Sequence, residues 1–572
     1  MKGKDWIIHP GSPEAESNIS SALNLHPVIS RLLVNRGVST PEDARLYLEG
    51  GLDSLHDPFT MAGMREAVDR VITAKAGGEK IVIYGDYDAD GVTATALLLS
   101  FFRQTGFNAS YYIPERLTEG YGLNTEALDS IKADGAGLVI TVDNGVNALD
   151  AISHAGSLGL DVIVTDHHKP GDALPSAIAV LNPNRADCPY PCKELAGVGV
   201  AFKLITALRS ELHKRGVAKD KLPVLRRLLD LVAIGSIGDC SALKGENRLL
   251  ARHGLTELSA TTRLGLSALK ETCGVNGSVS SREVSFALVP RLNAAGRMGK
   301  ADIGLELLLA GDIVEGKKIA IALDDENKRR QDLQADTLAE ALQAVETSLD
   351  PMRDRVIIIG SENWSPGVAG LVASKLVEKF GLPSAVVCFE GDFGKGSARS
   401  LPGFDITEAL GKVTAGVVRF GGHKMAAGFT IRRNEYEAFR ESLLAIVSQT
   451  LKPEGARPRI MIDLETEPAL VNKDLLTRIK VLEPFGEGNP TPVFMSSGVS
   501  FASSTVVGKD GRHTRLTLRD GTQIMGFNMA ERLSGADMRS GRYDIVYTAE
   551  ISVWKETARV QFNLLDFRVC AE

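Results

Sequence analysis

The chain has 572 residues, of which 44% are hydrophobic and 24% charged, and its net charge is −7. This composition excludes a disordered chain, a fibrous repeat and a membrane protein, since no apolar run approaches the roughly 18 residues of a spanning helix. The acidic balance excludes a nonspecific basic coat for nucleic acid and leaves a local basic groove open. Six scattered cysteines, and an N-terminus unlike a secretory signal, predict reduced thiols and a cytoplasmic location.

At about 150 residues per domain, the length predicts three or four domains. Taken in chain order, we expect a helical N-terminal segment, a region of alternating strands and helices, connecting helices, a second and smaller α/β domain, and a β-rich C-terminal domain. Their expected ranges are 1–65, 66–300, 301–350, 351–450 and 456–572. Strands that alternate with helices predict a parallel sheet whose ligands bind at the carboxyl ends of the strands.

The N-terminal segment carries a helix start at Ser39-Thr40-Pro41-Glu42, with a capping residue and a proline in the first turn. Apolar runs then predict buried strands near 81–84, 137–142, 160–165 and 177–182. The proline-free stretch 301–349 keeps a 3.6-residue period and predicts one or two long helices. After 456, short alternating strands predict a β-barrel or sandwich.

Acidic and histidine residues stand at four positions that we interpret as the ends of strands. They are Asp86, Asp88 and Asp90; Asp143; Asp166, His167 and His168; and Asp239. One acidic turn alone is commonly a helix cap or a solvated loop, but four in this order predict a shared cleft. Crowded carboxylates raise one another's pKa unless a cation neutralises them. Carboxylate and imidazole ligands suit Mn²⁺, Mg²⁺, Fe or Zn better than Ca²⁺, and paired ions are the usual device for phosphoester cleavage.

These motifs resemble the DHH phosphoesterases, a superfamily named after the pattern seen here at 166–168. The likeness is closest to the RecJ family of that superfamily and extends over nearly the whole chain. The matching segments, in family order, include IYGDYDADGVTATALL, TVDNG, VTDHHKP, LAGVGVAFKL, PRLNAAGRMGKA, GKGSARS, FGGHKMAAGF and PFGEGNPTPVF. The resemblance implies an α/β fold in which a parallel-sheet DHH domain is joined by long helices to a smaller α/β DHH-associated domain, followed by a C-terminal OB-like β-barrel.

The resemblance also implies an activity, that of a single-stranded-DNA-specific 5′→3′ exonuclease in DNA repair and recombination. Such an enzyme releases 5′-mononucleotides by metal-dependent phosphodiester hydrolysis with one or two Mn²⁺ or Mg²⁺ ions. Carried over by position, the metal ligands are Asp86, Asp88, Asp90, Asp143, His167 and Asp239, and the catalytic set is Asp88, Asp90, Asp143, His167, His168 and Asp239. Tyr84 stands where some relatives have histidine, so we expect one tightly bound ion and one that arrives with substrate.

Several further segments are candidates for substrate binding. We interpret PRLNAAGRMGKA as a loop that presents Arg291, Asn293 and Arg297, because arginine is a natural phosphate partner. The other candidates are Arg116, Ser397, Arg399 and His423; the resemblance implies that His423 lies in a glycine-rich loop facing the metal site. GKGSARS lacks the order of a P-loop, and Ser365 replaces a histidine common in relatives. In the C-terminal domain, Arg512, His513, Arg515, Phe527 and Trp554 could contact phosphates and bases.

Two alternatives remain open beside the exonuclease. A short-oligonucleotide or small phosphoester hydrolase of the same superfamily would be shorter and lack the barrel, so residues 456–572 favour a long substrate. A non-catalytic replication scaffold would tolerate loss of metal ligands, whereas this chain retains them. We expect a monomer that binds single-stranded DNA in a channel and contacts no membrane. By resemblance only, a single-strand-binding protein or a helicase would be its partner.

Overall fold

The computed structural model describes residues 4–115, 119, 122–299, 302–348, 354–451, 459–534, 541–554 and 557–570. The chain forms two compact units. The first comprises residues 56–241 and 250–457, and the second comprises residues 2–55, 242–249 and 458–572. Among the helices of the described ranges, none combines the length and hydropathy needed to cross a bilayer.

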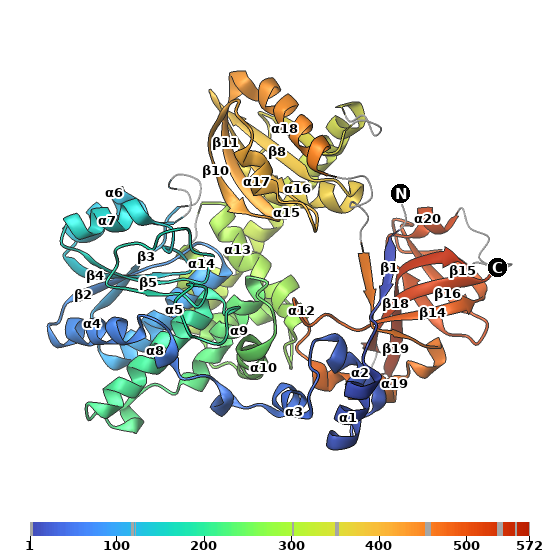
Figure 1. Cartoon of the computed structure of the whole chain (residues 1–572), viewed down its shortest axis with the longest axis horizontal. Helices are drawn as coiled ribbons and strands as arrows, with labels where there is room; N and C mark the ends of the chain where they lie inside the picture. The colour runs from blue at the N-terminus through green and yellow to red at the C-terminus, as the bar shows by residue number, and fades with distance from the viewer. Residues whose placement is uncertain are drawn as a thin grey trace. The chain divides into compact units, whose positions relative to one another are not determined.

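The first unit begins with an all-parallel sheet of five strands in the order β3-β2-β4-β5-β6. The strands are β2 (Lys80–Tyr84), β3 (Ala109–Tyr112), β4 (Ala136–Val142), β5 (Asp161–Thr165) and β6 (Ala179–Leu181). The helices are α4 (Met64–Ala76), α5 (Ala89–Thr105), α6 (Thr125–Ala133), α7 (Leu149–Ser157) and α8 (Gly197–Lys214). Helices α6 and α7 cover one face and α4, α5 and α8 the other (Figure 1), so the central strands are apolar on both faces. Strand β3 was not predicted, because NASYY is short and lacks an apolar run.

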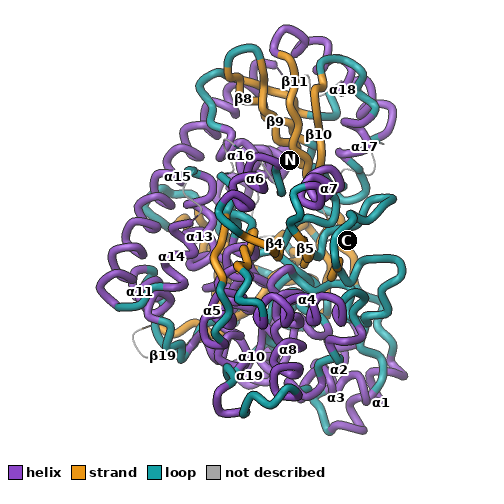
Figure 2. Tube along the Cα trace, turned by 90° about the vertical axis from the view of Figure 1, so that its left-hand side faces the viewer, coloured by secondary structure: helices purple, strands orange, loops and turns teal. Residues whose placement is uncertain are grey.

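A helical region follows this sheet. It contains α9 (Leu229–Gly238), α10 (Gly245–Ser259), α11 (Leu264–Thr272), α12 (Ser281–Glu283), a π-helical turn (Val284–Leu288), α13 (Val289–Arg297), α14 (Asp302–Leu309) and α15 (Ile313–Ser348). The 36-residue α15 runs past α11, α13 and α14 to α16 (Figure 2), as expected of the connecting helices. The interpretation of PRLNAAGRMGKA as a loop was wrong, because Leu292, Ala294 and Ala295 bury one side of helix α13.

The second sheet of this unit is mixed, in the order β10-β11-β9-β8-β7, with only β7 and β8 parallel. Its strands are β7 (Ile357–Ser361), β8 (Ser384–Glu390), β9 (Phe393–Arg399), β10 (Val417–His423) and β11 (Ala426–Arg432). Helix α16 (Pro366–Phe380) packs on one face; α17 (Ile406–Gly411) and α18 (Tyr436–Thr450) pack on the other. The glycine-rich segment before His423 is the end of strand β10 and not a loop, since Gly421 and Gly422 pair with Gly428 and Ala427.

The second unit joins the N-terminal helices to a seven-stranded sheet of order β13-β14-β18-β19-β17-β16-β15. Its elements are α1 (Pro13–Leu23), α2 (Pro27–Asn35), α3 (Pro41–Glu49), α19 (Lys473–Ile479), α20 (Ala530–Ser534), β13 (Leu464–Glu465), β14 (Val493–Val499), β15 (Phe501–Val507), β16 (His513–Leu518), β17 (Gln523–Gly526), β18 (Tyr543–Trp554) and β19 (Thr557–Val569). Thr40 caps α3 by accepting from Asp43 N at 3.1 Å, as predicted.

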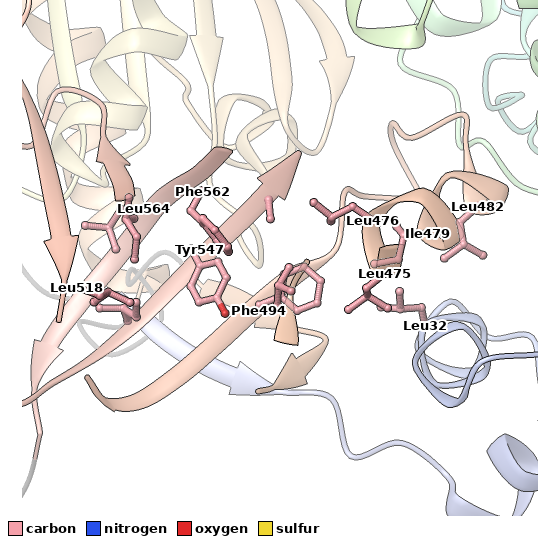
Figure 3. Packing of buried hydrophobic residues seen from close by; sticks show 14 of the residues in the cluster. Leu32, Leu475, Leu476, Ile479, Leu482, Phe494, Leu518, Tyr547, Phe562 and Leu564 are labelled. Carbon is pink, nitrogen blue, oxygen red and sulfur yellow. The ribbon is translucent and has the colours of Figure 1, made fainter. Parts of the chain in front are cut away.

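The hydrophobic core of this unit contains residues from both its N-terminal and its C-terminal segments. Leu32 of α2 belongs to the same buried cluster as Leu476 of α19 and Phe494 and Tyr547 of the sheet (Figure 3). An unpredicted N-terminal strand, β1 (Asp5–Ile8), also pairs in parallel with β12 (Arg459–Ile462). The N-terminal helices therefore fold onto the C-terminal sheet.

Candidate metal centre

The turn after β2 holds the first group of acidic side chains. Asp88 is the N-cap of α5, and its Oδ1 accepts from the N–H groups of Asp90 at 3.0 Å and Gly91 at 3.1 Å. Asp86 Oδ1 accepts from Tyr87 N at 2.7 Å. A Cβ on Gly91 would lie 2.6 Å from the Cβ of Asp86, so only glycine lets the first turn of α5 pass this close to Asp86.

Asp90 is 1% exposed and is held by the start of helix α8. Its two carboxylate oxygens accept from Gly197 N at 2.7 Å and Val198 N at 2.9 Å, so the positive end of the helix dipole faces the carboxylate. A Cβ on Gly197 would lie 2.8 Å from the Cβ of Asp143. The glycine therefore allows Asp90, Asp143 and α8 to meet.

Asp143 and the two histidines follow the neighbouring strands β4 and β5. Asp143 has φ of 62°, and its N–H donates to Thr165 O at 3.0 Å. His167 Nε2 lies 3.0 Å from Asp143 Oδ1. The ring of His168 faces Asp166 instead, with Nδ1 2.7 Å from Asp166 Oδ1. Asp166 also accepts from the N–H groups of His167, His168 and Val146, so this buried carboxylate orients the whole turn.

Asp239 reaches the same place from a helix, which corrects the expectation of a fourth strand end. It is the C-cap of α9, whose residues 229–237 are all buried between neighbouring helices. A stretch apolar on every side fits a buried helix as well as a buried strand, and the sequence pattern does not separate the two. Asp239 Oδ2 lies 3.9 Å from His167 Nε2 and accepts from Ser241 Oγ at 2.6 Å.

All six predicted metal ligands lie in three overlapping groups whose ligand atoms are within 4.8 Å of one another. The groups are Asp90, His167 and Asp239; Asp143, His167 and His168; and Asp86, Asp88 and Asp143. Burial and the neighbouring carboxylates raise the pKa values of Asp90 and Asp143 well above the ordinary value, while burial lowers the pKa of His167. The buried Nε2 of His167 makes no hydrogen bond to any residue described. Such a donor set fits a divalent cation, which would neutralise the carboxylates and engage this nitrogen.

The buried Asp166–His168 pair predicts a pH dependence of stability in the metal-free protein. Burial alone would lower the pKa of His168, but the hydrogen bond to Asp166 and nearby acidic charges raise it to about 9; Asp166 has a lowered pKa despite burial. The raised imidazole pKa contributes stability that is fully present below the unfolded pKa of about 6.5. This contribution is lost as the pH rises through the folded pKa of about 9. The lowered carboxyl pKa adds stability above about pH 4.

Asp166→Asn should therefore destabilise the EDTA-treated protein by about 3 kcal/mol at pH 6 and by much less at pH 10. Urea unfolding at a series of pH values measures this difference. The exposed His154–Asp129 pair, with Nε2 and Oδ1 2.8 Å apart, is a matched control, and Asp129→Asn should change stability by less than about 0.5 kcal/mol. An Asp166→Asn effect that is equal at pH 6 and pH 10 would contradict the prediction.

The predicted substrate-binding residues differ in their position relative to the metal centre. His423 stacks on His168 with ring centroids 5.9 Å apart, so the end of β10 reaches the metal centre. Arg399 Nη1 donates to Ser397 Oγ at 3.0 Å on strand β9, which β11 separates from β10 in the same sheet. Arg297 Nη1 donates to Gly367 O at 3.3 Å, in the first turn of α16.

Two other candidates have partners within the fold. Arg291 forms an ion pair with Asp324, 2.8 Å from Nη2 to Oδ1. Asn293 Oδ1 accepts from Ala89 N at 2.7 Å and so supports the turn that carries Asp88. Their contacts with substrate stay predictions. Arg116 lies outside the described residues, as does the side chain of Trp554.

Sequence reasoning placed Asp166 in the predicted cleft but gave it no role, although it organises the histidine turn. Its place in the D-H-H pattern was the available signal. In the second unit, Phe527 is 48% exposed and contacts the ring of His513 edge-on, with centroids 5.5 Å apart. This leaves an aromatic side chain available on the surface of the C-terminal domain.

The parallel sheet with its acidic and histidine edge, and the mixed sheet that brings His423 to it, define a DHH phosphoesterase. Residues 80–236 match the model of the DHH family N-terminal domain, 353–451 the DHHA1 domain and 462–566 the RecJ OB domain. The chain belongs to the RecJ family. It is 39% identical to the single-stranded-DNA-specific exonuclease RecJ of Bacillus subtilis, over 99% of this chain and 71% of that protein.

Other members of the family are similar over most of their length. The RecJ of Escherichia coli is 36% identical over 84% of this chain and 85% of its own. The crystal structure of RecJ from Thermus thermophilus in complex with Mn²⁺ matches with a TM-score of 0.85 and 30% identity, over 99% of this chain and 79% of that chain. A structure of the same protein with Mg²⁺ has a TM-score of 0.78 at 28% identity, over 99% of this chain and 78% of that one.

Proposed function

We propose that this protein degrades single-stranded DNA from the 5′ end and releases 5′-mononucleotides by metal-dependent phosphodiester hydrolysis, in DNA repair and recombination. The observation that carries the proposal is the convergence of acidic and imidazole ligands on Asp143 and His167, in a chain of the RecJ family. A scaffold without catalysis would have no need to keep a buried cluster of mutually repelling carboxylates.

The metal-binding residues would be Asp86, Asp88, Asp90, Asp143, His167 and Asp239, with Mn²⁺ or Mg²⁺ as the ion. Bound divalent ions supply a Lewis acid that activates water and stabilises charge on a phosphate. Asp143 and His167 each belong to two of the three ligand groups, which supports adjacent ion positions. We propose one tightly bound ion and a second that binds with substrate.

The remaining side chains would bind and orient the substrate. Asp166 fixes the ring of His168 through Nδ1, and we expect this ring to bind a phosphate oxygen of the substrate. His423 stacks on this ring from the second sheet. Together with Arg399 and Ser397 on β9 of the same sheet, it would hold non-bridging oxygens or the 5′-phosphate.

A degradation assay tests this function. The substrates are a long single strand labelled at its 5′ end, the same sequence as a duplex, and a dinucleotide, each with Mn²⁺, Mg²⁺ or EDTA. We expect release of labelled mononucleotide from the single strand only, and only with metal. Cleavage of the dinucleotide alone would replace the proposal with a small-substrate hydrolase, and no cleavage under any condition would leave a scaffold. A monomeric state, a cytoplasmic location and recruitment by a single-strand-binding protein or helicase stay predictions of the family resemblance.

A further inference from the structure

The second sheet carries one face that extends away from the metal centre. Successive side chains on a strand alternate between faces, so His423, Gly421 and Arg419 of β10 share the face that His423 turns toward His168. The backbone register continues this order across the sheet, because Gly421 pairs with Gly428 of β11 and Gly428 pairs with Ser397 of β9. The face is therefore built in rows at increasing distance from the metal centre.

In the row next to His423, Gly421 and Gly428 form a floor without side chains. A Cβ built on Gly421 or Gly428 would meet no described atom within 4 Å beyond its chain neighbours. Both glycines are exposed, and neither has a positive φ, so the backbone conformation does not require glycine. Because glycine has no side chain, a ligand can reach the backbone surface of the sheet at these two positions.

The next row bears charge. It consists of Arg419, Thr430 and Lys395, which are paired across β10, β11 and β9. Arg419 is exposed and, among the residues described, forms no ion pair. Lys395 is half exposed and lies 3.2 Å from Glu390 through its Nζ. An acidic protein thus presents an uncompensated guanidinium on the same face as His423.

The spacing of these rows follows from strand geometry. Two residues along a strand span about 6.7 Å, so Arg419 lies about 13 Å along β10 from His423. A substrate phosphate held near His423 would therefore be followed, across the glycine floor, by an arginine that is free to bind a second phosphate of the same strand. Arginine suits this role because its planar guanidinium matches phosphate oxygens with two parallel donors.

We propose that Arg419, supported by Lys395 and Thr430, binds a backbone phosphate of the DNA strand outside the cleavage position, with the strand lying over Gly421 and Gly428. This inference rests on the proposed function and adds a second contact region to it. It assigns Arg419 to substrate binding alone, because the residue is too far from His423 to touch the reacting phosphate. Its effect should appear only with substrates long enough to reach it.

The test compares Arg419→Gln with the wild-type full-length chain. Binding of a long fluorescent single strand is measured by anisotropy in EDTA over a series of salt concentrations, and cleavage of that strand and of a single strand too short to reach Arg419 is measured with Mn²⁺. Loss of one phosphate contact should reduce the slope of log K against log salt by about 0.7 and weaken binding about fivefold at low salt. For the long strand KM should rise with kcat little changed, and cleavage of the short strand should not change.

Two further variants sharpen the outcome. Arg440→Gln removes a cation from α18, which packs on the opposite face of the same sheet, and should leave the slope unchanged. Gly421→Leu fills the floor without altering charge and should weaken long-strand binding at every salt concentration. A wild-type slope in Arg419→Gln, with the wild-type enzyme active on single strands, would overturn this inference and leave the proposed function intact. Absence of single-strand cleavage by the wild-type enzyme would instead count against the proposed function itself.

Discussion

Asp143→Asn is expected to lower the rate of single-strand cleavage at least about 100-fold while the protein stays folded. Asp143 is the acid shared by two of the three ligand groups, so its loss affects two of the three ion positions that these groups can form. The amide is nearly the same size as the carboxylate but cannot supply the negative charge. Asparagine also tolerates the φ of 62° at this position better than alanine does.

The same variant should not lose stability when metal is absent. Burial, followed by repulsion from Asp90, raises the pKa of Asp143, which means that the charged form is disfavoured in the folded protein. Removing the charge relieves that repulsion. Bound metal, by contrast, stabilises the wild type by about 2.7 kcal/mol at a concentration 100 times its Kd. We therefore expect Mn²⁺ to raise the melting temperature of the wild type strongly and that of Asp143→Asn little.

Thermal melting with EDTA and with Mn²⁺, together with the cleavage assay, checks both parts of this prediction. Asp150→Asn, an exposed acid in the first turn of α7, is the matched control and should behave as the wild type. Full cleavage by Asp143→Asn would remove Asp143 from the metal site. Unfolding of the variant in EDTA would show that the carboxylate stabilises the fold, contrary to the electrostatic argument.

The second large effect concerns Arg248, a side chain only 1% exposed within the second unit. Its guanidinium donates to Leu482 O at 2.8 Å and to Val481 O and Tyr47 O at 3.3 Å each. It also lies 3.8 Å from the centre of the Tyr47 ring. Arg248 thereby ties α3 to the turn after α19. Arg248→Ala would leave several buried carbonyl groups without their donor, and it should destabilise this unit by about 3 kcal/mol or more.

Urea titration followed by hydrogen exchange and mass spectrometry can locate this loss. Peptides from α3, α19 and β14 should exchange at lower urea in Arg248→Ala, whereas peptides from β2 and β4 should not change. Arg45→Ala, which removes an exposed arginine from α3, should have little effect. Equal exchange of the α19 peptides in Arg248→Ala and the wild type would show that the buried guanidinium contributes nothing to this unit.

By itself, the amino-acid sequence determined the α/β architecture of this protein and indicated which residues are candidate metal ligands. Short apolar runs such as Ile81–Tyr84 are typical of buried central strands. The acids and histidines that follow β2, β4 and β5 must then meet at one edge, because parallel strands end on the same side. This local logic is sufficient to place Asp88, Asp143 and His167 close together.

Only the tertiary structure decided how the remaining parts reach that edge. Asp239 arrives from a helix because a stretch buried on all sides carries no periodicity that separates helix from strand. Asp166 becomes the partner of His168, and Asn293 supports the turn at Ala89, through contacts between residues up to 204 positions apart. The row of Arg419 behind His423 depends on strand register, which is set by pairing between strands and not by any one segment.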